Sequence, residues 1–333
     1  MEYLSELGVF TGKTMIATLA IGSLLILLFA LIAKARKIQV TLTVENLNKK
    51  YEGLAQALRE AVWDPKQAKL ERKAQKKRDK QRDADRKRIY VLDFQGDIRA
   101  SHVENLREEI TSLLTILRPE RDEVVVRVES PGGMVHTYGL AATQLIRLRQ
   151  AGVQVTVCVD KVAASGGYMI ACTANRIVAA PFAIIGSIGV VAQIPNFHRL
   201  LKKHDIDYNE YTAGEFKRTV SLLGEITEKG RRKFLDQIED THGMFKAFVK
   251  QYRPQLELEK VATGEYWHGQ QALELNLVDE LAASDDYLFR RREEADIYSV
   301  KSPSTKKWSE KLAENIARLT ARLIENSSQI GQF

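Results

Sequence analysis

Between residues 89 and 159, short apolar runs alternate with longer stretches in which apolar residues recur every three or four positions. The short runs are continuous and rich in β-branched residues, which predicts strands over Ile89–Phe94, Val124–Val128 and Val153–Val159. The periodic stretches predict helices over Val103–Leu117 and Val135–Gln150. Strands that alternate with helices in this way form a parallel sheet with helices around it, so the predicted fold class is α/β.

The C-terminal half reads as mainly helical. Its periodicity predicts a long helix over Glu225–Tyr252 and a second one over Gly269–Asp279, where Asn276 can take the left-handed capping conformation. A last apolar stripe at helical spacing is expected to pack against a neighbouring element, and it comprises Leu312, Ile316, Leu319 and Leu323.

Two long uncharged runs call for different interpretations. The 20 residues Thr14–Ala33 would span roughly 30 Å as a helix, which is the thickness of a bilayer core. This run is longer than the apolar part of a cleavable signal peptide and positive charge follows it, so we interpret it as a retained membrane anchor. The second run, Ile177–Phe197, contains Pro181, Gly186 and Pro195, and we interpret it as buried strands and turns.

The charge of the chain is concentrated in one segment. The 333 residues carry a net charge of +7, and their 44% hydrophobic content is ample for a core. Residues 66–88 hold 12 lysines and arginines against 4 acidic residues, so this segment carries +8 and the remaining residues −1. The segment is interpreted as a solvated helical or disordered linker, with binding to anionic lipid headgroups as the alternative. Nucleic-acid binding is not expected, because no aromatic residues interrupt the basic run.

The candidate chemistry begins at Ser165. This serine follows an apolar strand-like run and precedes Tyr168–Ala174, which can form a helix, so it lies at a strand-to-helix junction where backbone N–H groups are free. Ser130-Pro-Gly-Gly133 also follows a predicted strand. Small-residue clusters also occur at ordinary strand ends, so a structural role stays open. With one N–H donor from each junction, the two would form an oxyanion hole.

Four motifs in order resemble the signal peptide peptidase A family of membrane serine proteases, over roughly residues 88 to 285. They are Ser130-Pro-Gly-Gly133, Ala164-Ser-Gly-Gly-Tyr168, Gly186-Ser-Ile-Gly-Val190 and Thr212-Ala-Gly-Glu-Phe-Lys-Arg218. The resemblance implies a ClpP/crotonase-like fold of repeated βα units behind a transmembrane helix and a basic linker. It also implies a serine endopeptidase that acts on signal-peptide-like or unfolded chains at the bacterial plasma (inner) membrane.

The same resemblance assigns roles to five residues. Ser165 is the nucleophile, Lys217 the general base and Ser187 the hydroxyl that orients the lysine, while the backbone N–H groups of Gly133 and Gly166 form the oxyanion hole. A lysine with an ordinary pKa of about 10.4 can accept the serine proton only if burial lowers that pKa by roughly 2 to 3 units. Lys202 and Lys203 are poorer candidates, because they belong to a short amphipathic helix with a solvated basic face.

Other catalytic classes have little support in the sequence. The Gly-x-Ser-x-Gly elbow is absent around Ser165, and the position about 25 residues later, where a ClpP-like triad would have its histidine, is Val190. His136 is expected to cap or pack at the start of a helix. The remaining histidines lack metal-ligand spacing, so neither a metal nor a cofactor is predicted. Cys158 and Cys172 are expected to be buried free thiols.

The predicted organisation has four parts: an anchor over residues 1–35, a basic linker over 36–87, the protease domain over 88–290 and a helical extension over 291–333. Expected partners are peptide or unfolded substrates, membrane lipid around the anchor and, by resemblance, further copies of the chain in a ring. The face of the membrane stays open: five positive charges follow the anchor, which favours a cytoplasmic domain, whereas the resemblance implies the outer face. The alternative functions are a crotonase-type acyl-CoA enzyme and a membrane-tethered scaffold without activity.

Overall fold

The computed structural model describes residues 13–16, 18, 19, 21–24, 42–80 and 85–302. The chain divides into two units, Met1–Thr41 and Leu42–Phe333. In the first unit the described residues are helical. Within the described part of the chain, no helix is both long and apolar enough to cross a membrane. Most of the predicted anchor, and the stripe from Leu312 to Leu323, lie outside the described residues.

The second unit is built around a seven-stranded sheet. Its strand order is β1 (Thr43–Asn46), β10 (Ala295–Lys301), β2 (Lys87–Gln95), β3 (Glu123–Glu129), β4 (Gln154–Val159), β6 (Arg176–Ala179) and β9 (Glu280–Leu281). All neighbouring pairs are parallel except β1 with β10. This confirms the α/β class and the three strands predicted between residues 89 and 159.

A second, smaller sheet has Ser165 and Ser187 directly after two of its strands. It contains β5 (Val162–Ala164), β7 (Ile184–Gly186) and β8 (Tyr266–His268), with β5 parallel and β8 antiparallel to β7. An isolated bridge between Ser130 and Ala163 joins it to the end of β3. The second uncharged run therefore forms strands and turns, as predicted, but its last residues, 191–197, are exposed and not buried as expected.

The helices bury the two faces of the main sheet against separate apolar clusters. The larger cluster contains residues of α4 (Val103–Leu114), α5 (Val135–Gln150), α6 (Gly166–Ala171) and α8 (Glu228–Tyr252). The smaller one contains Leu47 of α2 (Leu47–Val62) and Tyr287 and Leu288 of α11 (Ser284–Arg291). The central strands β2, β3 and β4 thus have apolar residues on both faces, which explains why their sequences contain continuous apolar runs.

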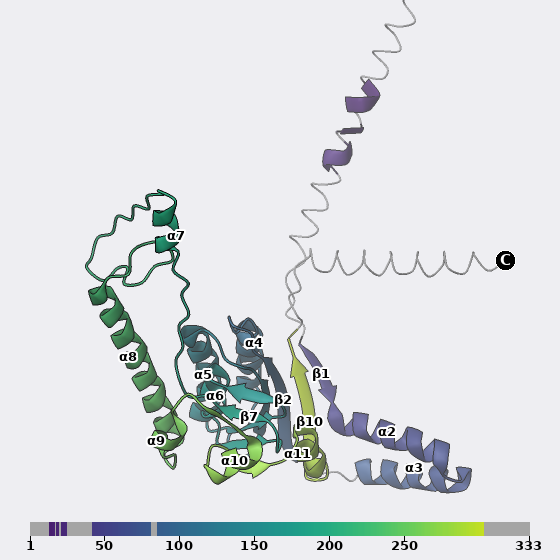
Figure 1. Cartoon of the computed structure of the whole chain (residues 1–333). Helices are drawn as coiled ribbons and strands as arrows, with labels where there is room; N and C mark the ends of the chain where they lie inside the picture. Colours follow the sequence, from purple (N-terminus) through teal and green to yellow (C-terminus); the bar gives the residue numbers. More distant parts are fainter. Residues whose placement is uncertain (1–12, 17, 20, 25–41, 81–84, 303–333) are drawn as a thin grey trace, which may run out of the picture. The chain divides into compact units, whose positions relative to one another are not determined.

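Most predicted helices have the expected positions. Helix α5 has the predicted bounds, α8 begins three residues later than predicted, and α4 ends three residues earlier. Helix α10 (Gly269–Glu274) is shorter than predicted, and Asn276 just beyond it has a φ of 60°, as its capping role requires. In Figure 1, α7 (His198–Lys203) and α9 (Leu258–Val261) lie at opposite ends of α8.

Two segments outside the predicted protease domain take part in its sheet. Strands β1 and β10 lie in the segments interpreted as linker and C-terminal extension, and β10 is inserted between β1 and β2. The basic linker contains α2 and α3 (Pro65–Lys80), which pack against each other. The four-part division remains a prediction.

Candidate active site

Ser165 lies at the junction between β5 and α6, as predicted from its neighbours in the sequence. Its backbone has φ 52° and ψ −118°, a conformation that costs free energy in a residue with a Cβ. The Ser165 N–H donates to the carbonyl oxygen of Gly186 at 2.8 Å, and Met169 N–H donates to the Ser165 carbonyl at 2.9 Å. These bonds hold the half-buried serine in its strained turn, a geometry in which its side chain could be presented to a substrate.

The turn Ser130–Gly133 is tied directly to the strand that carries Ser165. The Ser130 N–H donates to the carbonyl of Val162 at 2.8 Å, and the Ala164 N–H donates back to the Ser130 carbonyl at 3.0 Å. A Cβ on Gly132, whose φ is +96°, would lie 2.7 Å from the Ser165 Cβ and 2.8 Å from the Gly166 nitrogen. The two glycine-containing turns are therefore in backbone contact beside the serine.

Both oxyanion-hole candidates occupy positions that only glycine fits. A Cβ on Gly133 would lie 2.2 Å from the carbonyl oxygen of Ile98, and one on Gly166 would lie 2.4 Å from the ring of Tyr138. Among the described residues, the N–H groups of Gly133 and Gly166 have no hydrogen-bond acceptor. Two unpaired amide donors next to a presented serine are the elements of an oxyanion hole.

Ser187 lies next to the carbonyl that anchors Ser165. Strands β5 and β7 pair Ala164 with Gly186, so Ser187 follows on the neighbouring strand. Its φ is 51°, its N–H donates to the Glu265 carbonyl at 2.7 Å, and its hydroxyl donates to the Gly264 carbonyl at 3.3 Å. The structure thus brings Ser165, Ser187, Gly133 and Gly166 into one region at the end of the small sheet.

Lys217 is in a different environment. It belongs to the segment between β7 and α8, whose residues 207–218 are all exposed. Its own N–H donates to the Gly214 carbonyl at 3.1 Å, and among the described residues its ammonium group has no hydrogen-bond or ion-pair partner. The apolar burial that a neutral lysine requires is not provided around Lys217 in this single chain.

The competing candidates give no alternative site. Helix α7 carries Lys202 and Lys203 and is exposed, as expected for a solvated basic face. His136 is exposed in the first turn of α5, and Met134, not His136, is the capping residue. Within the described residues, no group of three or more histidine, cysteine or acidic side chains could hold a metal ion. Cys158 and Cys172 are buried and unpaired, and burial raises the pKa of both thiols.

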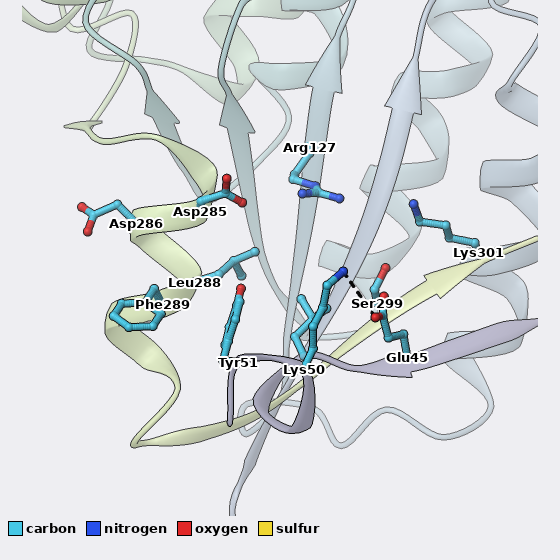
Figure 2. Close-up of a pocket in the computed structure, with 11 residues that line it drawn as sticks. Glu45, Lys50, Tyr51, Arg127, Asp285, Asp286, Leu288, Phe289, Ser299 and Lys301 are labelled. Atoms are coloured by element: carbon cyan, nitrogen blue, oxygen red, sulfur yellow. Dashed lines mark ion pairs between the residues drawn. The ribbon is translucent and has the colours of Figure 1, made fainter. Parts of the chain in front are cut away.

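The unit also has a cavity of about 500 Å³ that contains none of the predicted site residues. Figure 2 shows it between β1, α2, β3, β10 and α11, with Lys50 paired to Glu45 and with Arg127 and Lys301 on its wall. Arg127 and Lys301 both pair with Asp93, at 2.6 Å and 3.0 Å. Because Arg127 and Lys301 are already paired with this carboxylate, which does not line the cavity, the cavity offers no evident chemistry.

Two buried hydroxyl groups next to the turn Ser130–Gly133 were not identified from the sequence. The Ser130 Oγ lies 2.6 Å from the Tyr138 Oη, and both residues are fully buried. Tyr138 also donates to the Asp97 carbonyl at 2.7 Å, and Gly132 N–H donates to the Ser130 Oγ at 3.1 Å. Tyr138 is a core residue of an apolar helix face, and nothing in that pattern marks its hydroxyl as part of a site.

Comparison with known proteins identifies the family of this chain. Two family models match consecutive parts of the chain: the N-terminal model of peptidase family S49 over residues 2–145, and the peptidase family S49 model over residues 147–298. The "Probable protease SohB" of Buchnera aphidicola subsp. Acyrthosiphon pisum is 50% identical over 245 residues, which cover 74% of this chain and 70% of that protein. The chain belongs to peptidase family S49. This confirms the family and the enzyme class predicted from the four motifs.

Two further proteins extend the comparison. The "Probable protease SohB" of Haemophilus influenzae is 62% identical over 213 residues, which cover 64% of this chain and 60% of that protein. The match therefore spans less than two thirds of that relative. Among solved structures, a mutant of the 1510-N membrane-bound stomatin-specific protease in complex with a substrate peptide matches with 15% identity and a TM-score of 0.42, over 69% of this chain and 98% of that chain.

Proposed function

We propose that this S49 protein is a membrane-anchored serine endopeptidase that hydrolyses peptide bonds with Ser165 and Lys217. The observation that carries the proposal is the strained conformation of Ser165 beside the two unpaired N–H groups of Gly133 and Gly166. Backbone strain of this kind persists where the surrounding structure enforces it, and it is frequent at reactive sites. The ClpP/crotonase-like fold and the anchor over Thr14–Ala33 belong to the same proposal.

In the proposed reaction, the Lys217 amine takes the proton of the Ser165 hydroxyl while Oγ attacks the carbonyl carbon of the scissile bond. The carbonyl oxygen becomes an oxyanion that accepts hydrogen bonds from Gly133 and Gly166. When the C–N bond breaks, the Lys217 ammonium returns the proton to the leaving amine, and an acyl-enzyme remains. Water then repeats the sequence and releases the acid. Ser187 orients the neutral lysine through its hydroxyl.

This chemistry requires Lys217 to be desolvated. Lowering a lysine pKa by roughly 2 to 3 units corresponds to about 3 to 4 kcal/mol. The exposed segment around Lys217 also carries Phe197, Tyr211 and Phe216, with 44%, 92% and 40% of their surfaces accessible. We propose that further copies of the chain cover this segment in a ring, and that the assembly restricts access to extended or unfolded chains such as signal peptides.

The anchor would hold the enzyme at the bacterial plasma (inner) membrane. The positive charges after it favour a cytoplasmic catalytic unit, and the likeness to signal peptide peptidase A favours the outer face. A reporter enzyme fused to the C-terminus and active on only one side of the membrane decides between the two. The basic segment 66–88 is proposed to be a spacer between the bilayer and the catalytic unit.

The test uses the full chain in detergent and an unfolded protein substrate. Ser165→Ala and Lys217→Ala should each abolish hydrolysis, and a serine-reactive phosphonate should label Ser165 only in folded protein. A crotonase-type acyl-CoA enzyme would retain its activity in both variants, because it needs only the backbone donors. Absence of labelling, of peptide hydrolysis and of acyl-CoA turnover in the folded wild-type chain would identify a scaffold instead of an enzyme.

A further inference from the structure

Tyr138 and Ser130 form a chain of hydrogen bonds next to the turn Ser130–Gly133, and we call this chain the relay. The direction of each bond follows from the last acceptor, because the carbonyl of Asp97 can only accept and Tyr138 must therefore donate to it. The Tyr138 hydroxyl has one proton, so the Ser130 hydroxyl donates to Tyr138 and keeps its lone pairs for the Gly132 N–H. The relay runs from Gly132 through Ser130 and Tyr138 to Asp97, and each N–H or O–H proton in it is donated to an acceptor.

The relay occupies a tightly closed space. A Cβ on Gly96 would lie 2.3 Å from the Ser130 Oγ and 2.4 Å from the Tyr138 Oη, so this position admits only glycine. Below the hydroxyl, the Tyr138 ring packs against Phe94 at 6.3 Å between centroids and against Gly166. Burial raises the pKa of the Tyr138 phenol, so its hydroxyl keeps its proton at neutral pH.

The same tyrosine therefore contacts one half of the proposed oxyanion hole directly and is linked to the other half through Ser130. Its ring supports Gly166, and its hydroxyl reaches Gly132 through Ser130. The Gly132 N–H donates inward to Ser130, which fixes the plane of the Pro131–Gly132 peptide. The N–H of the next peptide, that of Gly133, has no acceptor in the described residues. Hydrogen-bonded chains of this kind reinforce one another in a low-dielectric interior.

We infer that Tyr138 is a positioning residue of the oxyanion hole: through Ser130 it fixes the Gly132 peptide so that the Gly133 N–H stays available beside Ser165. The inference rests on the proposed peptidase function and deepens it. It predicts that loss of the Tyr138 hydroxyl impairs the stabilisation of the transition state while substrate binding is preserved.

The test compares Tyr138→Phe with wild type in the full chain. Phenylalanine keeps the ring contacts with Gly166 and removes only the hydroxyl. We expect kcat to fall about 10- to 100-fold with KM within twofold, since displacing a donor costs less than the 10²- to 10³-fold of removing one. Affinity for a peptide aldehyde, which forms the oxyanion, should fall by the same factor. Ser130→Ala should have a similar effect, and the double variant should lose little more.

Tyr287→Phe is the matched control. Tyr287 is equally buried, and its hydroxyl donates to Glu123 at 2.7 Å on the other face of the sheet. This variant should lose stability and keep kcat. The inference is overturned if Tyr138→Phe behaves like Tyr287→Phe, with a lower Tm and a kcat within twofold of wild type.

Amide exchange separates this inference from the proposed function. In ¹⁵N-glycine-labelled protein, Tyr138→Phe should accelerate hydrogen exchange of the Gly132 N–H, whereas Tyr287→Phe should not. Unchanged exchange would show that the relay does not hold the turn, whatever the activity. If Gly132 exchange is accelerated in Tyr138→Phe while Ser165→Ala keeps undiminished hydrolytic activity, the relay is supported and the peptidase proposal is rejected.

Discussion

The two halves of the proposed dyad lie in contrasting environments. Ser165 is half-buried at the end of the small sheet, has a strained backbone, and lies so close to Gly132 that a methyl group there would clash with its Cβ. Lys217 lies in the segment between β7 and α8, and residues 207–218 around it are all exposed. In the proposed mechanism, the core of a single chain would thus prepare the nucleophile and the oxyanion hole. The proposed burial of Lys217 would come from contacts that this segment makes with further copies of the chain.

The largest loss of activity should come from substitution of Lys217, the exposed residue of the proposed dyad. Lys217→Ala should lower kcat/KM by about 10³-fold, within the range that a general base contributes. Lys217→Arg should be as inactive, because a guanidinium keeps its proton. Lys202→Ala is the control, since Lys202 is an exposed lysine of the same segment. Equal activities of the Lys202 and Lys217 variants would remove Lys217 from the mechanism.

A smaller loss of activity is expected when a methyl group is added to the turn beside Ser165. Gly132→Ala places a methyl group 2.7 Å from the Ser165 Cβ in a backbone conformation with φ +96°. We expect kcat to fall about 100-fold and unfolding to require about 2 to 4 kcal/mol less. Gly139→Ala is the matched control, because Gly139 lies in α5 with open space around it and should gain about 0.5 to 1 kcal/mol. A Gly132→Ala variant with full activity would show that the turn does not serve the serine.

The proposed cover of Lys217 can be tested without changing the dyad. Tyr211 is 92% exposed, so Tyr211→Ser should leave the folded core intact. Loss of a buried aromatic side chain from an interface costs about 2 kcal/mol or more, which corresponds to roughly 30-fold weaker self-association. As the protein is diluted, the sedimentation coefficient and the specific activity of Tyr211→Ser should then fall more steeply than those of wild type. Met244→Ser changes another exposed apolar residue, on α8, and should alter neither measurement.

The smallest effect on activity is expected at Glu109, whose substitution should change mainly the stability of the protein. This carboxyl is buried in α4, accepts the Ser302 N–H at 2.6 Å through Oε1, and leaves Oε2 without a partner. Burial raises its pKa from 4.5 to about 7, and the charge of Asp93 acts in the same direction. The folded protein therefore holds a proton that the unfolded chain releases, so stability falls as pH rises from about 4.5 to about 7.

In Glu109→Gln this pH dependence should disappear. At pH 8 the variant should be more stable than wild type by an amount on the order of 3 kcal/mol, and at pH 4 the two should be nearly equal. Urea unfolding of the detergent-solubilised chain at both pH values measures this difference. A stability gap that is the same at both pH values would contradict the raised pKa.

The sequence alone determined much of this protein. Continuous apolar runs marked the three central strands, the break in pattern at Ser165 marked its junction, and four motifs identified the family. These features are local, because periodicity and turn chemistry act over a few residues. The presented serine and the two glycine turns therefore agree with what the pattern predicts.

Only the tertiary structure decided which distant residues meet. It inserted β10 beside β2, joined Ser130 to the strand before Ser165, and linked Tyr138 to Gly132 through a serine hydroxyl. It also left Lys217 on an exposed segment, although its motif suggested a buried amine. Burial and hydrogen-bond direction depend on residues far apart in the chain, and a linear pattern of apolar and polar positions contains no information about their contacts.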